Sequence, residues 1–167
     1  YIFGQDAGQN LTGAGHSNIL IGSEAGQNLT TGTRNVFVGN LTGDEATVGS
    51  QNVGIGYAVL ANQELASEGN VAMGSNNMSQ LRTGDYNISL GYETLQMNRD
   101  GQDNIAIGRN AGRQTVSGSY NIWIGTRAGY GTSSIGNTQD AGFKYNIAIG
   151  SEAQASALDK DGAVVYN

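Results

Sequence analysis

A five-residue phrase recurs along the whole chain and constrains its fold more than any other feature. The phrase reads Asn, aliphatic residue, variable residue, aliphatic residue, Gly. Its complete copies begin at Asn18, Asn35, Asn52, Asn70, Asn87, Asn104, Asn121 and Asn146. The phrase glycines recur at a nearly constant interval from Gly4 to Gly125, and the last interval, from Gly125 to Gly150, is clearly longer. A unit this short cannot bury its own apolar side chains, but a stack of such units can.

The alternation within each phrase predicts a strand, because every second side chain lies on the same face of a strand. The glycines predict turns that need a positive φ or a close backbone approach. The repeated Asn predicts side-chain ladders between stacked turns. The absence of Pro suits stacked strands, in which a Pro would delete a hydrogen bond. We therefore predict an all-β chain, a parallel β-roll or β-solenoid of about nine 17-residue coils, with 1–167 as a single repeat domain.

The uniformly aliphatic second and fourth positions of the phrase are assigned to the core. That prediction covers Ile19, Ile21, Val36, Val38, Ile105, Ile107, Ile122, Ile124, Ile147 and Ile149. About three aliphatic side chains per coil cannot offset the entropy lost on ordering the whole coil, so the chain is expected to bury further surface by oligomerisation.

The third position of the phrase carries no charged residue and mixes large with very small side chains. We interpret it as the subunit interface, and a tolerant surface column is the alternative. The residues assigned to this interface are Leu20, Phe37, Ala72, Ala106, Trp123 and Ala148.

Composition excludes several classes of function. The chain has no Cys, which excludes disulfides and zinc sites built on Cys, and its one His leaves little room for catalysis centred on histidine. The net charge of -6 argues against nucleic acid, and no apolar run is long enough to insert in a membrane. We expect no cofactor and no metal.

Two features are candidates for receptor binding. The long last interval predicts an insertion loop within 126–145, where an added loop either recognises a partner or is neutral. A tyrosine precedes the phrase Asn in several later coils, either as a binding surface or as simple turn packing. The candidate residues are Tyr130, Asn137, Phe143 and Lys144 in the loop, and Tyr86, Tyr120 and Tyr145 in the turns. Asp6 and Glu24, on adjacent coils, give only a weak indication of a glycosidase carboxylate pair.

The phrases at Asn35–Gly39 and Asn104–Gly108, followed by Ala-Gly and Thr-Gly turns, resemble the YadA-like head repeat of trimeric autotransporter adhesins. They are also similar to the repetitive shafts of phage tail fibres. The resemblance covers nearly all of 1–167 and implies a left-handed, homotrimeric β-roll. It also implies an extracellular protein, on a bacterial cell surface or a phage virion, that binds a host surface protein or glycan.

The expected function is therefore that of a structural and adhesive fibre segment, part of a longer fibrous chain, that presents a receptor-binding surface. An enzyme is not expected. The alternative is a carbohydrate-active, depolymerase-like segment of a phage tail spike.

Overall fold

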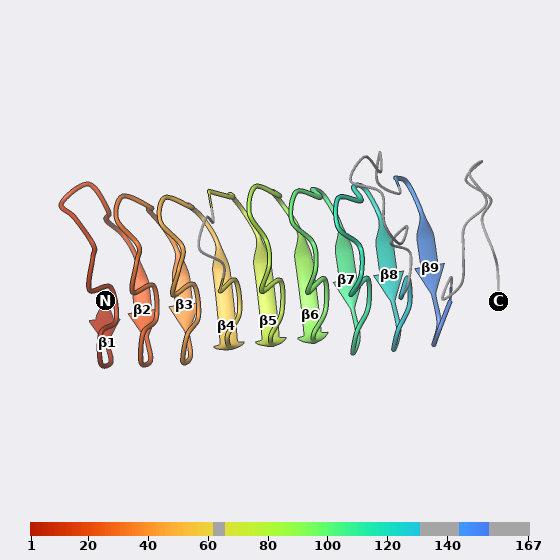
Figure 1. The fold of residues 1–167 in the computed structure, drawn as a ribbon, viewed down its shortest axis with the longest axis horizontal. Helices are drawn as coiled ribbons and strands as arrows, with labels where there is room; N and C mark the ends of the chain where they lie inside the picture. Colours follow the sequence, from red (N-terminus) through yellow and green to blue (C-terminus); the bar gives the residue numbers. More distant parts are fainter. Residues whose placement is uncertain (62–65, 131–143, 154–167) are drawn as a thin grey trace.

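The computed structural model describes residues 1–61, 66–130 and 144–153, which form an all-β solenoid with a single parallel sheet along one side (Figure 1). Nine strands lie in the sheet in chain order, and each pairs in register with the next, as Leu20 with Phe37. The strands are β1 (Ile2–Phe3), β2 (Ile19–Ile21), β3 (Val36–Val38), β4 (Val53–Tyr57), β5 (Val71–Ser75), β6 (Ile88–Tyr92), β7 (Ile105–Ile107), β8 (Ile122–Ile124) and β9 (Ile147–Ile149).

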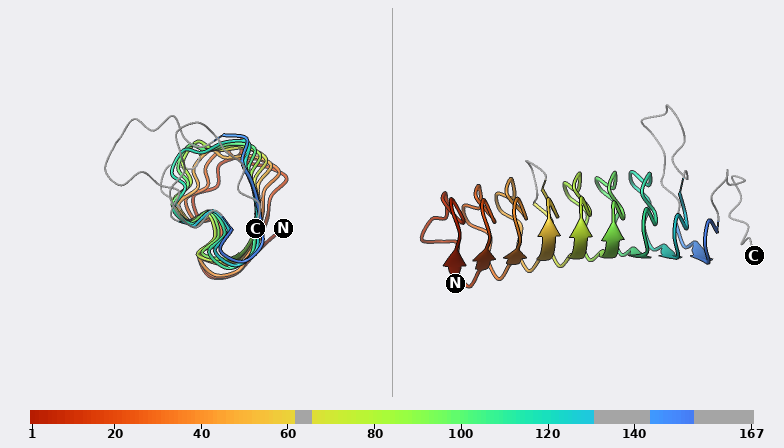
Figure 2. Two further views of the ribbon diagram at one scale, coloured as in Figure 1. Left: turned by 90° about the vertical axis from the view of Figure 1, so that its right-hand side faces the viewer. Right: turned by 90° about the horizontal axis from the view of Figure 1, so that it is seen from below.

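The predicted parallel β-solenoid is confirmed, and so is its period, since each regular coil contains one copy of the phrase. Viewed along the axis, successive coils lie almost on top of one another (Figure 2). The predicted number of about nine coils was too high, because nine strands enclose only eight connections. Seven of these connections, from β1 to β8, have the regular length, and the connection from β8 to β9 is longer.

The two faces of each strand are the reverse of the prediction. The third-position side chains Leu20, Phe37 and Trp123 are completely buried inside the coil. Ala72, Ala106 and Ala148 are buried in the same column, so the assignment of this column to a subunit interface was wrong. The second- and fourth-position side chains, assigned to the core, instead lie on the outer face of the sheet, where they are half-buried or exposed. Alternation separates two faces but does not say which one points inward.

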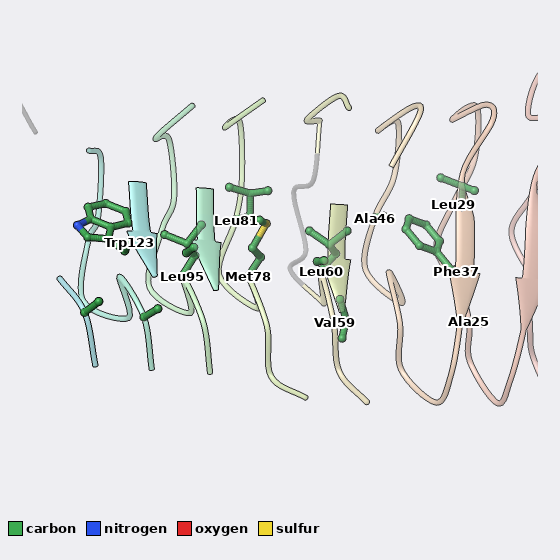
Figure 3. Packing of buried hydrophobic residues seen from close by; sticks show 14 of the residues in the cluster. Ala25, Leu29, Phe37, Ala46, Val59, Leu60, Met78, Leu81, Leu95 and Trp123 are labelled. Carbon is green, nitrogen blue, oxygen red and sulfur yellow. The ribbon is translucent and has the colours of Figure 1, made fainter. Parts of the chain in front are cut away.

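The interior is filled by two columns whose volumes compensate. The first column is the third position of the phrase, and the second is the turn residue six positions later. Coils with a large strand residue have Gly in the turn, as in Phe37 with Gly43 and Trp123 with Gly129. Coils with a small strand residue have a large buried turn residue. These pairs are Gly54 with Leu60, Ala72 with Met78, and Ser89 with Leu95 (Figure 3).

Among the coils in which both positions are described, that of Ala106 breaks this rule, and its neighbours supply the missing volume. Ala106 and its turn partner Gly112 are both small. A Cβ atom at Gly112 would lie 2.7 Å from the Trp123 ring and 2.9 Å from Leu95. The large side chains of the adjacent coils thus occupy the space between Ala106 and Gly112, so each coil is packed together with its neighbours.

The predicted asparagine ladder is present, and it runs inside the solenoid. The Asn18 amide donates to the Gly32 carbonyl at 2.9 Å, and its Oδ1 atom accepts from the backbone N–H of Asn35 at 2.9 Å. Both ends of the buried amide are therefore satisfied, which a buried polar group requires. The backbone N–H of every later phrase Asn also bonds the Oδ1 atom of the preceding one.

The phrase glycines are required for two reasons. Gly22 has φ of 128°, a region that other residues rarely adopt, and a Cβ atom there would lie 2.5 Å from the Gly39 carbonyl oxygen of the next coil. The other phrase glycines share this φ. The sequence-based explanation of these glycines is therefore confirmed.

Candidate interaction surfaces

The outer surface of the sheet carries an unbroken aliphatic face. We use this name for the second- and fourth-position residues of the phrase, all of which are Ile, Val, Leu or Met from β2 to β9. Apart from Ile147 and Ile149 in the last strand, its most exposed members are Met73 at 41%, Ile21 at 40% and Ile88 at 39%. Its members are Ile19, Ile21, Val36, Val38, Val53, Ile55, Val71, Met73, Ile88, Leu90, Ile105, Ile107, Ile122, Ile124, Ile147 and Ile149. A continuous exposed apolar surface of this kind usually marks an interaction site.

A column of turn residues flanks the aliphatic face. Each of these residues directly precedes a phrase Asn, and each has a left-handed backbone with φ between 55° and 69°. The sequence candidates Tyr86, Tyr120 and Tyr145 are exposed and belong to this column, which we call the tyrosine column. The rings of Tyr120 and Tyr145 are stacked, with centroids 5.1 Å apart and an interplanar angle of 9°. Tyr120 and Tyr145 therefore form an ordered aromatic surface, and Tyr86 lies two coils before Tyr120 in the same column.

Two further candidates, Tyr130 and Lys144, lie at the ends of the predicted insertion loop. Lys144 pairs with Ser119 through an isolated parallel bridge, next to Tyr145 in sequence. Asn137 and Phe143 lie outside the described residues, as does most of the loop between 126 and 145. The structure brings Lys144 close to the tyrosine column, and Tyr130 belongs to a different surface.

That surface is a network of polar side chains in the turns, centred on Arg113. The Arg113 Nε atom lies 3.0 Å from Glu93 Oε2 and donates to Gln96 Oε1 at 2.9 Å. Its Nη1 atom donates to the Tyr130 hydroxyl at 3.4 Å. These residues come from three successive coils, so the network ties the coils together.

Sequence reasoning missed this network. Glu93 and Arg113 lie on adjacent coils but do not occupy equivalent positions of the repeat, so the pattern becomes visible only when the turns are superposed. The network continues into the next coil, where the Arg127 guanidinium lies 4.7 Å from the centroid of the Tyr130 ring and 3.0 Å from Glu152 Oε1.

Two carboxylates near the other end of the rod, Glu24 and Asp44, have the same separation in sequence as the pair Glu93 and Arg113. Burial raises the pKa of Asp44 to about 6, with further contributions from the charges of Glu45 and Glu24. The Oδ1 atom of Asp44 is buried and has no hydrogen-bond partner among the described residues. Glu24 therefore faces a like charge here, whereas Glu93 faces the Arg113 guanidinium at the equivalent place.

Asp44→Asn should make the protein more stable at neutral pH. Because the folded state raises the pKa of Asp44, it binds a proton more tightly than the unfolded chain does, and stability falls as the pH rises from about 4 to about 6. Because Asn carries no charge, it removes this loss. The free energy of unfolding at neutral pH should rise by about 1 kcal/mol, since solvent screens this half-exposed group. Urea unfolding at pH 4 and pH 7 measures the difference. Asp103→Asn, at an exposed turn, is the control, and an equal gain at both pH values would contradict the explanation.

The chain has no match among protein-family models, curated proteins or solved structures. Within the described ranges, no three His, Cys, Asp or Glu side chains lie together as metal ligands would. That same part of the chain contains no helix with the length and hydropathy needed to span a membrane.

Proposed function

We propose that this chain is a structural and adhesive segment of a homotrimeric fibre, in which the aliphatic face is the surface between subunits. The observation that carries the proposal is that face itself: sixteen aliphatic positions on the outside of one sheet, with no charged or polar residue among them. Water would contact these side chains in a single copy, and burying them against other copies would stabilise the assembly.

The regularity of the face supports a partner of the same kind. Its side chains recur once per coil, at the spacing of paired strands, over the whole length from β2 to β9. A second and a third copy of this chain present the same repeat and can match it coil by coil. The resemblance to trimeric adhesin heads and phage fibre shafts favours three copies, and an extracellular place on a bacterial surface or a phage virion.

In this arrangement the exposed turns lie outside the aliphatic face and remain available to a receptor. The tyrosine column and the Arg113 network are the two ordered surfaces that the described turns offer. We assign them the role of presenting the receptor-binding surface, toward a host surface protein or glycan.

Ile107→Lys should convert the assembly to single copies. Ile107, 36% exposed, lies on the aliphatic face, and a lysine there would place a charge in the contact between subunits. Val116→Lys is the matched control, since Val116 is also 36% exposed but lies in a turn. Light scattering at micromolar concentration measures the mass. A wild-type monomer, or a trimer that survives Ile107→Lys, would contradict the proposal.

A second candidate function, the depolymerase-like segment, is favoured by one observation only. Glu24 and Asp44 are neighbouring carboxylates of which one has a raised pKa, as in glycosidases. Release of reducing ends from a surface polysaccharide, lost in Asp44→Asn, would support this function. Binding of the polysaccharide without cleavage would exclude it.

A further inference from the structure

The aliphatic face has a second border, opposite the tyrosine column. It consists of the residues that directly follow the phrase glycines, and we call it the exit column. Its backbone is bonded from coil to coil, as where Asn110 N–H bonds the Tyr92 carbonyl at 2.9 Å and Arg127 N–H bonds the Arg109 carbonyl at 2.8 Å. The members of the exit column are Gln5, Ser23, Asn40, Tyr57, Ser75, Tyr92, Arg109, Thr126 and Ser151. The aliphatic face therefore runs between two ordered columns.

Charged residues are rare in these two columns. In the part of the chain that the structure describes, they are Arg34 and Asp103 in the tyrosine column and Arg109 in the exit column. Asp103 and Arg109 border the same strand, β7, and both are exposed. Within 1–61, 66–130 and 144–153, neither side chain forms a hydrogen bond or an ion pair, so both charges are available to a partner.

Asp103 and Arg109 are too far apart to pair within one copy. They lie on opposite sides of the aliphatic face, with Ile105 and Ile107 between them. An extended segment from Asp103 to Arg109 spans about 20 Å, which is more than the two side chains bridge together. An ion pair between these two groups therefore needs a second copy of the chain.

A ring of three copies brings the two columns together. When the copies are related by rotation about an axis along the rod, the tyrosine column of each copy borders the exit column of the next. Rotation without translation keeps equal coils at equal height, so Asp103 lies beside Arg109 of the partner subunit. The same register sets Tyr86 beside Tyr92 of the partner subunit, and these tyrosines are 57% and 49% exposed. A shift by one coil would instead place Asp103 beside Tyr92 or Thr126 of the partner subunit.

Reversed rods would give Asp103 a different neighbour. A rotation that turns one rod end to end sets the tyrosine column against the same column of the other copy, where the basic residue is Arg34. Such a rotation relates two copies and does not generate three. Arg34 and Arg109 therefore distinguish the two arrangements.

We propose that Asp103 forms an ion pair with Arg109 of the partner subunit and thereby holds the subunits parallel and in register. This inference rests on the proposed trimer and adds the orientation and register of its subunits. The tyrosine column then lies at the boundary between two subunits, so a receptor that binds this column contacts both of them.

Cross-linking tests the placement of the two residues, because the chain contains no Cys of its own. Asp103→Cys/Arg109→Cys, treated at micromolar concentration with a bis-maleimide of half the reach of that segment (about 10 Å), should give covalent trimers on a denaturing gel. Arg34→Cys/Asp103→Cys is the matched control. It carries both thiols in the tyrosine column and should stay a single chain, whereas reversed rods would convert it to covalent dimers.

Charge reversal tests the ion pair itself. Asp103→Arg, or Arg109→Asp, should raise the concentration at which half of the chains are trimeric at least about tenfold, because each trimer gains three like-charged contacts. The double variant should return to within about threefold of the wild type, since it restores opposite charges. The tyrosine column accepts Arg, because Arg34 has φ of 60° there and Asp103 has φ of 56°. Arg34→Asp, the control, should leave the assembly unchanged.

The possible results separate this proposal from the proposed function. If Ile107→Lys splits the trimer but neither charge reversal weakens it, the ion pair is overturned and the homotrimer stands. Covalent dimers without trimers from Asp103→Cys/Arg109→Cys would support the pair and contradict the homotrimer. Dissociation by Arg34→Asp, with covalent dimers from Arg34→Cys/Asp103→Cys, would overturn the parallel arrangement.

Discussion

Phe37→Ala should destabilise the chain by about 4 kcal/mol, because it empties a large, completely buried position in the solenoid interior. Gly43→Leu alone should also be unfavourable, by about 3 kcal/mol, since a Cβ atom at Gly43 would meet the Phe37 ring at 2.5 Å. Phe37→Ala leaves the interior space between these two positions underfilled, and Gly43→Leu overfills the same space.

The double variant Phe37→Ala/Gly43→Leu should therefore recover at least about 2 kcal/mol relative to the sum of the single changes. It reproduces the arrangement of the central coils, where Ala72 stands with Met78. The left-handed backbone is no obstacle, because Leu60, Met78 and Leu95 adopt φ of 53°, 47° and 48° at the equivalent turn.

Urea unfolding of the four proteins, at one fixed protein concentration, gives the double-mutant cycle. Phe3→Ala is a control for the substitution itself, since Phe3 is 78% exposed on the outer face and should cost less than about 1 kcal/mol. Additive effects of the two single changes would show that the columns do not share one space.

Asn87→Ala should cost about 4 kcal/mol, because several buried groups lose their partner together. The Asn87 amide donates to the Gly101 carbonyl at 2.8 Å and to Asn70 Oδ1 at 3.0 Å. Its Oδ1 atom accepts from the backbone and the side chain of Asn104, at 3.1 Å and 2.9 Å. Alanine can replace none of these bonds, and the site is closed to water.

A matched asparagine on the surface tests whether the loss comes from the buried ladder or from removing any hydrogen-bonded Asn side chain. Asn10 also bonds an asparagine of the next coil, Asn28 Oδ1 at 2.8 Å, but on the surface. Asn10→Ala should change the free energy of unfolding by less than about 0.5 kcal/mol, because water replaces the lost bond. Similar losses at Asn10 and Asn87 would mean that burial of the ladder does not determine its contribution.

The period of the phrase made the strands, the sheet order and the glycine turns predictable. Each phrase from Asn18–Gly22 onward contains a strand at its central residues, and the Asn ladder follows from stacking identical turns. These features depend on local residues and on the repeat alone, so one sequence is sufficient to find them.

Alternation alone did not predict which face of each strand points into the solenoid. Uniform aliphatic residues suggested a core, but a solenoid interior can vary from coil to coil if a second column compensates. The signal that could have settled it is the inverse relation between the third phrase position and the turn position six places later, as in Phe37 with Gly43 and Ser89 with Leu95. Asn shares a face with the third position, which also fits its buried ladder.

The contacts between turns were harder to predict, because they depend on the offset between superposed coils. The pair Glu93 and Arg113 and the like-charged pair Glu24 and Asp44 have the same spacing and opposite consequences. The closeness of Tyr120 and Tyr145 follows from their common column, whereas the parallel orientation of their rings requires the structure.

The shared volume around Ala106 and Gly112 limits how this repeat can be rearranged. Tandem repeats gain and lose units by duplication and deletion, and a phrase of constant period invites such exchange. Yet the coil of Ala106 is complete only between Leu95 and Trp123, so removing either neighbour would leave a void. Removing one of these coils alone would therefore be destabilising, and the order of large and small residues along the rod limits which coils can be gained or lost separately.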